Sequence, residues 1–150
     1  MKFSFREAKK KDEKLLLDWR NDSCVRKWSF RKKPITFFEH KKFFKEKIDD
    51  KNYHMWIFQK NSIPCGLVRI NIKDKKAVIN YYIDKKYRGR KLSIIMLTMM
   101  RNEFCKKYPK VKIYAYTLSK NIISTKSLLK AGFELESIKD KKRIYVYKCS

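Results

Sequence analysis

Metal ligands are scarce in this sequence, which has only two histidines, His40 and His54, among its 150 residues. The four cysteines stand at positions 24, 65, 105 and 149, and no two of them form a C-x-x-C pair. A structural zinc site usually needs ligands paired at short spacing. We therefore expect no metal, and four free thiols would suit a reducing cytosol.

Long apolar runs and linkers are also missing. The longest apolar stretches are short, as at 94–97, so no segment is expected to span a bilayer. Residues 1–6 lack the apolar core of a signal peptide. No repeat, low-complexity tract or Pro- or Ser-rich linker divides the chain. We expect a single domain over residues 1–150, in the cytoplasm and without a membrane partner.

Acidic residues are few: 15 Asp and Glu stand against 40 Lys and Arg, which gives a net charge of +25. Such a charge attracts polyanions. However, 31 of the basic residues are lysines and only nine are arginines, whereas readers of bases and phosphates usually favour arginine. The charge is either a lysine-rich surface of the kind that AT-rich coding sequences produce, or a field that attracts anionic ligands. In both cases a polycationic substrate would be repelled, and nucleic acid is not the expected partner.

Hydrophobic residues make up 43% of the chain and aromatic residues 15%, enough for a packed core. The hydrophobic periodicity predicts the element order β-α-α-β-β-β-α-β-α-β-β, in which an antiparallel meander precedes a βαβ crossover. We therefore predict an α+β fold with a mixed, mainly antiparallel sheet flanked by helices. The expected strands cover 2–7, 52–60, 66–72, 77–83, 111–117, 133–138 and 143–147, and the expected helices 12–19, 36–48, 92–104 and 124–131.

Details of three helices follow from the sequence. Asp12 is expected to cap the first helix, and residues 21–23 to end it. Residues 36–39 form a capping box that opens the second helix, whose apolar face is expected to carry Phe37 and Phe44. The third helix is expected to bury one face, including its methionines, which are predicted to pack in the core. That face consists of Leu92, Ile95, Met96, Met99, Met100 and Phe104.

The segment 81–93 carries the clearest chemical signal, because a strand, a basic turn with one glycine and a helix start follow one another. A helix N-terminus offers unpaired N–H groups and the positive end of the helix dipole, which suits an anion. Arg88, Arg90 and Lys91 add three positive charges there. A pyrophosphate site and an ordinary solvated turn both fit these residues.

The same segment resembles motif A of the GCN5-related N-acetyltransferases, R/Q-x-x-G-x-G/A, with Arg88, Lys91 and Ser93 at its three defined positions. N-I-I-S at 121–124, followed by L-K-A-G-F at 129–133, resembles the N-x-x-S…L-x-K-x-G-F ending of that family. W-R-N-D at 19–22 with I-T-x-x-E-H at 35–40 resembles the branch that acetylates nucleotide-activated amino sugars, and also the ribosomal-protein acetyltransferases. These matches keep the family's order over nearly the whole chain.

The resemblance implies an acetyl-CoA-dependent N-acetyltransferase in which the acceptor amine attacks the thioester directly. It implies that the pantetheine arm lies between the strands 77–83 and 111–117. The implied cofactor contacts are Tyr82, Ile83, Arg88, Gly89, Arg90, Lys91, Leu92, Ser93, Asn121 and Ser124, and the implied acceptor contacts are Trp19, Arg20 and Asn21.

Tyr82, Glu39 and His40 are the candidate catalytic residues. Each has a structural alternative, because Glu39 belongs to the capping box, His40 can pack in the fold, and Tyr82 is a strand residue. Asn121 can likewise serve as a helix cap. The amine must be neutral to attack, so a base acting through water would suffice.

Two positions depart from the family pattern. Lys91 replaces a glycine, and its Cβ restricts φ. Leu128 stands where many relatives carry a tyrosine that protonates the departing thiolate. The expected acceptor is an anionic nucleotide-linked amino sugar, a precursor of cell-surface or flagellar glycan. A protein N-terminus and a non-catalytic, basic nucleic-acid-binding module are the alternatives, and a homodimer is compatible with the sequence.

Overall fold

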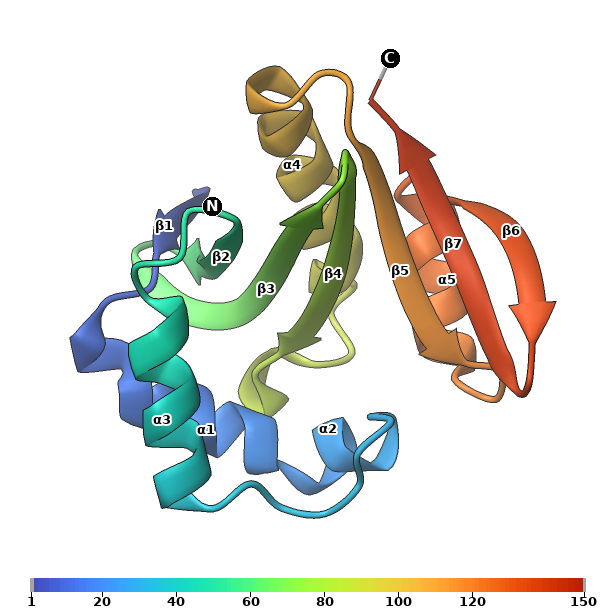
Figure 1. Ribbon diagram of the computed structural model, residues 1–150. Helices are drawn as coiled ribbons and strands as arrows, with labels where there is room; N and C mark the ends of the chain where they lie inside the picture. Colours follow the sequence, from blue (N-terminus) through green and yellow to red (C-terminus); the bar gives the residue numbers. More distant parts are fainter. Residues whose placement is uncertain (1, 150) are drawn as a thin grey trace.

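Seven strands form one mixed sheet in the computed structural model, which describes residues 2–149 (Figure 1). Their order is β1-β2-β3-β4-β5-β7-β6, and all neighbouring pairs are antiparallel except β4 and β5. The strands are β1 (Phe3–Glu7), β2 (Tyr53–Lys60), β3 (Ile63–Lys73), β4 (Lys76–Ile83), β5 (Lys112–Leu118), β6 (Glu134–Lys139) and β7 (Lys142–Lys148). The helices are α1 (Glu13–Asn21), α2 (Ser23–Lys27), α3 (Phe37–Lys47), α4 (Leu92–Lys107) and α5 (Ile122–Lys130). The predicted α+β class and the βαβ crossover, β4-α4-β5, are confirmed.

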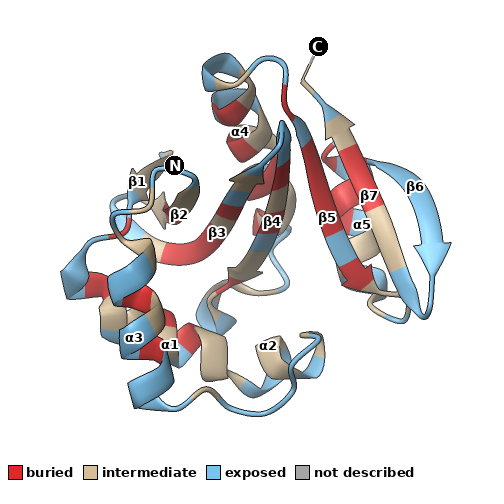
Figure 2. Ribbon diagram, in the orientation of Figure 1, coloured by how far each residue is buried: buried red, intermediate tan, exposed pale blue. Residues whose placement is uncertain are grey.

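Each face of the sheet buries its own core, because side chains alternate along every strand. Helices α4 and α5 pack on the face that carries Phe58 and Ile79, whereas α1 and α3 pack on the face that carries Leu67. The buried residues are concentrated in β2, β3, β5 and α4, whereas β6 is exposed along its length (Figure 2). Met96 and Met100 are fully buried, as predicted. Within residues 2–149, no helix is long and apolar enough to cross a membrane.

The short helix α2 was not predicted. The chain turns at Asp22, whose carboxylate accepts hydrogen bonds from the backbone N–H groups of Cys24 at 3.0 Å and Val25 at 3.3 Å. Asp22 ends α1, as expected, and it therefore also caps a new helix of five residues. Helix α2 lines a cavity of about 720 Å³.

Three expectations about helix faces and caps need correction. Phe37 is 59% exposed, and the buried positions of α3 are His40 and Phe44, because the first turn with its capping box lies in solvent. On α4, Ile95 lies outside the fully buried face. Asp12 stands before α1 but does not cap it, because its carboxylate binds the guanidinium of Arg6 at 2.8 and 2.9 Å.

The expectation of four free thiols is wrong for two of them. Cys105 near the end of α4 and Cys149 after β7 form a disulfide, with Cα atoms 5.1 Å apart. Cys24 is exposed and Cys65 is buried, and both are free. The bonded cysteines are 44 positions apart with no spacing motif, so only the fold brings the two thiols together.

The pairing of β4 with β5 covers only half of β4. The parallel register runs from Lys76 opposite Lys112 to Ile79 opposite Ala115, and beyond that point the strands diverge. On its other edge, β4 stays paired with β3 as far as Ile83 opposite Gly66. A Cβ at position 66 would lie 2.9 Å from the Ile83 side chain, so glycine permits this close packing.

Candidate active site

A cavity of about 720 Å³ lies where β4 and β5 diverge. It is walled by these strands, α2 and the loop after it, the turn before α4, and the starts of α4 and α5. Arg90 points elsewhere, because its guanidinium lies over the ring of Tyr87, 5.7 Å from the ring centre. The other sequence-predicted cofactor residues line the cavity, namely Tyr82, Ile83, Arg88, Gly89, Lys91, Leu92, Ser93, Asn121 and Ser124.

The turn before α4 takes the conformation that favours anion binding. Gly89 has φ 79°, and Lys91, which precedes the first residue of α4, has φ 59° and ψ 21°. Lys91 thus adopts the left-handed conformation for which glycine would be preferred, at an energetic cost. Left-handed residues beside helical ones direct successive backbone N–H groups into one concavity, and the N-terminus of α4 adds its unpaired N–H groups. Lys91 therefore has the left-handed backbone conformation that a glycine at this position would adopt more easily.

Arg88 is held at the cavity wall by two contacts. Its Nε donates to the carbonyl of Ile83 at 3.0 Å, and its Nη2 lies 2.9 Å from the carboxylate of Asp22. Burial works against the Asp22 carboxylate, but bonds from Arg88 and backbone N–H groups outweigh it and lower the pKa of Asp22. The turn is further fixed by Asp84, which accepts a hydrogen bond from the indole of Trp19 at 2.7 Å.

The start of α5 forms the opposite wall. The Asn121 side chain accepts from the backbone N–H of Ser124 at 3.2 Å, so Asn121 is a helix cap that also lines the cavity. The hydroxyl of Ser124 is hydrogen-bonded to that of Tyr81, and Ser93 on α4 is bonded to Ser127 at 2.8 Å. Leu128 is fully buried in the core.

The backbone of β4 presents N–H groups to the cavity. Asp84 donates its N–H to the carbonyl of Cys65 on the β3 side. Antiparallel pairs alternate between bonded and non-bonded residues, so Tyr82 and Asp84 direct their backbone groups toward β3. Tyr81 and Ile83 therefore direct their N–H groups toward the diverging edge of β5.

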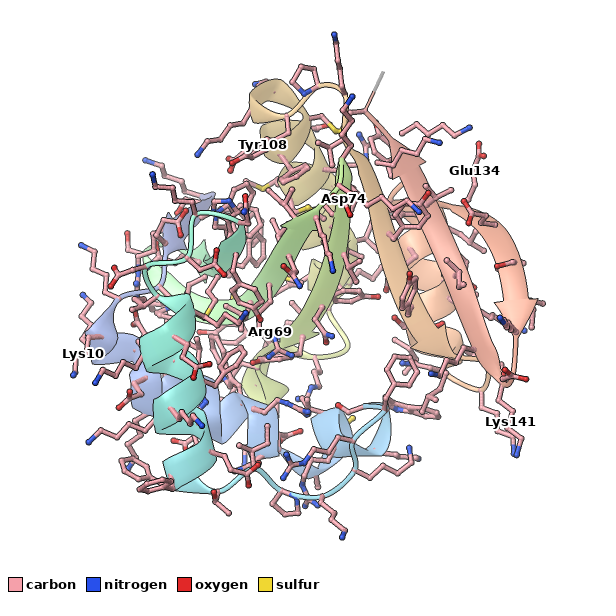
Figure 3. The ribbon with its side chains drawn as sticks, viewed as in Figure 1. Lys10, Arg69, Asp74, Tyr108, Glu134 and Lys141 are labelled. Carbon is pink, nitrogen blue, oxygen red and sulfur yellow. A yellow bond between two sulfur atoms is a disulfide. The ribbon has the colours of Figure 1, made fainter. Side chains whose placement is uncertain are left out.

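Three arginines gather on the face of the sheet that carries α1 and α3. Arg20 of α1, Arg31 and Arg69 of β3 line both the main cavity and a second cavity of about 370 Å³, and Tyr82 lies between the two. Figure 3 shows the Arg69 side chain in the space between α3 and β4. The Nε of Arg69 is buried without a hydrogen-bond partner among residues 2–149. Burial, and next the charge of Arg69, lower the pKa of Arg20.

Glu39 and His40 line the second cavity but not the main one. Glu39 is ion-paired with Arg31 at 2.8 Å and caps α3, and Arg31 lowers the pKa of Glu39 to about 2. His40 is buried, and its Nε2 lies 2.7 Å from the carbonyl of Glu13. Because a carbonyl only accepts, Nε2 is the nitrogen that carries the proton and Nδ1 is left as the acceptor.

Of the predicted acceptor residues, Arg20 lines the cavities, whereas Trp19 and Asn21 support the walls. Trp19 is buried, and the Asn21 amide exchanges two hydrogen bonds with the backbone of Ile35, at 2.7 and 2.8 Å.

Two residues that line the main cavity, Arg69 and Tyr81, were not predicted from the sequence as site residues. Arg69 could have been found from the sequence, because it stands between Val68 and Ile70. A charged side chain inside an apolar strand needs a charged or hydrogen-bonding partner.

The sequence model of a known family, described as acetyltransferase (GNAT) domain, matches residues 2–134. The chain belongs to the GNAT family. As a GNAT protein it is an N-acetyltransferase, an enzyme that uses acetyl-CoA as cosubstrate. Among proteins with curated descriptions, none is significantly similar in sequence to this GNAT enzyme.

Solved structures resemble the whole fold of this GNAT enzyme. The spermidine N-acetyltransferase from Vibrio cholerae, in complex with CoA and spermine, is 14% identical, with TM-score 0.83 over 96% of this chain and 92% of that one. The aminoglycoside acetyltransferase AAC(6')-Ib, in complex with coenzyme A, is 18% identical, with TM-score 0.80 over 97% and 93%. An N-acetyltransferase from Staphylococcus aureus Mu50 is 19% identical, with TM-score 0.79 over all of both chains. At these identities the likeness establishes the fold and leaves the acceptor open.

Proposed function

We propose that this enzyme acetylates the amino group of a nucleotide-linked amino sugar, a glycan precursor, with acetyl-CoA as the donor. The observation that carries the proposal is that Arg20, Arg31 and Arg69 line both the main cavity and the second cavity beside it, where we place the acceptor. Arginine is the residue best suited to bind phosphate, because its planar guanidinium donates two parallel hydrogen bonds.

The charges around the cluster favour an anionic acceptor. Arg31 is ion-paired with Glu39. Among residues 2–149, neither Arg20 nor Arg69 forms an ion pair with a carboxylate. Two buried or half-buried cations without a counter-ion are costly unless a ligand supplies the negative charge. A diphosphate would supply it, whereas a polyamine or an aminoglycoside would bring further positive charge. This enzyme should therefore differ in acceptor from the spermidine and aminoglycoside enzymes that share its fold.

The turn before α4, which also lines the main cavity, suits the pyrophosphate of acetyl-CoA. The left-handed turn at 89–91 and the N-terminus of α4 supply backbone N–H groups, and Arg88 and Lys91 supply positive charge. In our proposal, Asn121 and Ser124 flank the pantetheine arm, which runs along the open edge of β4. The N–H groups of Tyr81 and Ile83 then face the thioester carbonyl, and one such donor contributes about 3 kcal/mol to transition-state stabilisation.

The acceptor amine reacts in its neutral form, and a base removes a proton through water. Glu39 is a weak base, because Arg31 holds its pKa at about 2. Tyr82 stays protonated, because burial raises its pKa. His40, with Nδ1 available, is the candidate that can accept the proton.

Calorimetric titration with acetyl-CoA and thiol release with defined acceptors test the proposal. We expect binding of acetyl-CoA and faster thiol release with a UDP-amino sugar than with a peptide amine or spermidine. No binding at millimolar acetyl-CoA would instead favour a non-catalytic, basic nucleic-acid-binding module. Faster turnover of the peptide amine would favour an N-terminal acetyltransferase, and faster turnover of spermidine would overturn the argument from the arginines.

Two matched variants test the role of the arginines. Arg69→Met should raise KM for the UDP-amino sugar by about 10- to 100-fold, the loss expected for hydrogen bonds to a charged group, without changing acetyl-CoA affinity. Arg143→Met is the control, because Arg143 is also a strand arginine with a buried, unpartnered Nε but does not line either cavity. Equal effects of the two changes would argue against an acceptor role for Arg69.

A further inference from the structure

The cavity contains a hydroxyl pair in the region where the family pattern lacks its acid. Many relatives carry a tyrosine at the position of Leu128, but here that side chain is fully buried and absent from the cavity lining. The hydroxyl of Tyr81, on β4, is instead hydrogen-bonded to the hydroxyl of Ser124, on the first turn of α5. Both residues line the cavity.

Tyr81 and its neighbour Tyr82 lie on opposite faces of the sheet. Tyr82 packs with the core of α1 and α3 and lines the cavity beside Arg20 and Arg69. Tyr81 packs with the core of α4 and α5, two residues beyond Ile79, where β4 separates from β5. The strand therefore carries Tyr82 on the face where the arginines line both cavities, and Tyr81 on the other face, where it lines the main cavity alone.

We propose that Tyr81 protonates the sulfur that leaves acetyl-CoA and that Ser124 positions its hydroxyl. The proposal rests on the proposed function, since it requires acetyl-CoA to lie along β4. It moves the acid from α5, where the family pattern has it, to a strand residue held by a serine of α5.

The proton and electron balance of the step is complete. The acceptor nitrogen forms a bond to the acetyl carbon, and the C–S bond breaks with its electron pair going to sulfur. Tyr81 gives its hydroxyl proton to that sulfur. The acylated nitrogen loses one proton, and an equivalent proton returns to Tyr81 through the hydroxyl of Ser124. No oxidant, reductant or metal is consumed.

The surroundings of Tyr81 keep the proton on its oxygen before the reaction. Burial raises the pKa of Tyr81, the bond to Ser124 opposes this, and Tyr145 of β7 adds to the rise. A phenol in this setting keeps its proton at neutral pH and is a weaker acid than a thiol, so Tyr81 passes its proton to the developing thiolate only as it regains one through Ser124.

Tyr81→Phe and Tyr145→Phe form the matched test. Each change removes one tyrosine hydroxyl bonded to α5, because the hydroxyl of Tyr145 donates to Thr125 at 3.0 Å, but Tyr145 does not line the cavity. We expect Tyr81→Phe to lower kcat by about 100-fold or more, with KM for acetyl-CoA changed less than about threefold. We expect Tyr145→Phe to keep kcat near that of the unchanged enzyme, and Ser124→Ala to give an intermediate loss.

A second readout needs no acceptor. If Tyr81 donates to the sulfur, the thiol of bound CoA should ionise more easily in the unchanged enzyme than in Tyr81→Phe, by about one pKa unit. The absorbance of the thiolate, followed against pH with CoA bound, measures this difference. Thermal unfolding of both variants checks that the fold is kept.

The outcomes separate this proposal from the proposed function. Equal kcat in the two phenylalanine variants, or a kcat loss with no change in the CoA thiol, would overturn the role of Tyr81 while leaving the acetyltransferase function in place. A Tyr81-dependent thiol pKa without turnover of the UDP-amino sugar would support Tyr81 and overturn the proposed acceptor. Absence of CoA binding would overturn both.

Discussion

Replacing Lys91 by glycine should stabilise the chain relative to replacing it by alanine. Lys91 has φ 59° and ψ 21°, a conformation that costs a residue with a Cβ about 1–2 kcal/mol. Glycine avoids this cost but loses roughly 0.5–1 kcal/mol more backbone entropy on folding. The expected difference in the free energy of unfolding is therefore about 0.5–1 kcal/mol in favour of glycine. Both substitutions remove the same charge, so their difference isolates the Cβ.

Thermal and urea unfolding of the ligand-free protein measure the effect. For a chain of this size, 1 kcal/mol corresponds to a Tm shift of about 2–4 °C, so Lys91→Gly should melt roughly 1–4 °C above Lys91→Ala. The urea m-value should be the same in both, because neither change alters the surface exposed on unfolding.

The same argument predicts the opposite sign two residues earlier. Gly89 has φ 79°, and a Cβ built there meets no atom within 4 Å. Gly89→Ala should therefore cost about 1 kcal/mol through backbone conformation alone. If Lys91→Gly is no more stable than Lys91→Ala, or if Gly89→Ala costs nothing, the turn before α4 does not hold the left-handed conformation and the argument for a pyrophosphate cradle fails.

Three further predictions concern stability. Gly66→Ala should cost about 1–3 kcal/mol in urea unfolding, because the new Cβ would lie 3.0 Å from a backbone oxygen of β4; an unchanged midpoint would contradict the close packing. The hydrogen bonds from Arg6 lower the pKa of Asp12 in the folded protein. The Asp12 carboxylate therefore stabilises the fold at pH values above its unfolded pKa of about 3.9. This contribution to stability is lost as the pH falls through the lower pKa of the folded state. Asp12→Asn should thus be about 1–2 kcal/mol less stable at pH 7 and should approach the unchanged protein under strong acid, whereas a gap independent of pH would contradict the ion pair. Reduction of the Cys105–Cys149 disulfide, which closes 44 residues, should lower the free energy of unfolding by up to about 4 kcal/mol, and Cys105→Ser should reproduce the stability of the reduced protein.

Local patterns in the sequence were sufficient to predict the architecture of the fold. Apolar residues alternate along a strand and recur every three or four positions along a helix because one face of each element is buried. The strands and the long helix α4 follow these patterns closely. Phe37 shows where the pattern fails, because a phenylalanine at helical spacing is buried only if another element covers that turn. The turn before α4 was predictable because its basic residues, Arg88, Arg90 and Lys91, lie within four positions of one another.

The arginines that we propose bind the acceptor were less accessible to sequence reasoning. Arg20 and Arg31 are 11 positions apart, but Arg69 lies much later, in β3, and the packing of α1 on the sheet brings them together. Tyr81 and Ser124 are 43 residues apart and meet only because β4 and α5 lie on either side of the open edge. Contacts of this kind depend on the register and crossover geometry, which no local pattern records.

The divergence of β4 and β5 has a consequence for solubility. It leaves two strand edges in the middle of a sheet, and open edges are the places where foreign strands add and aggregates begin. Here α2 and the loop after it wall the opening, and lysine-rich surroundings oppose the approach of another copy of this basic chain. An extended ligand lying along β4 would cover the remaining edge. The protein should therefore resist aggregation better with CoA bound than without it, for reasons separate from any gain in folding stability.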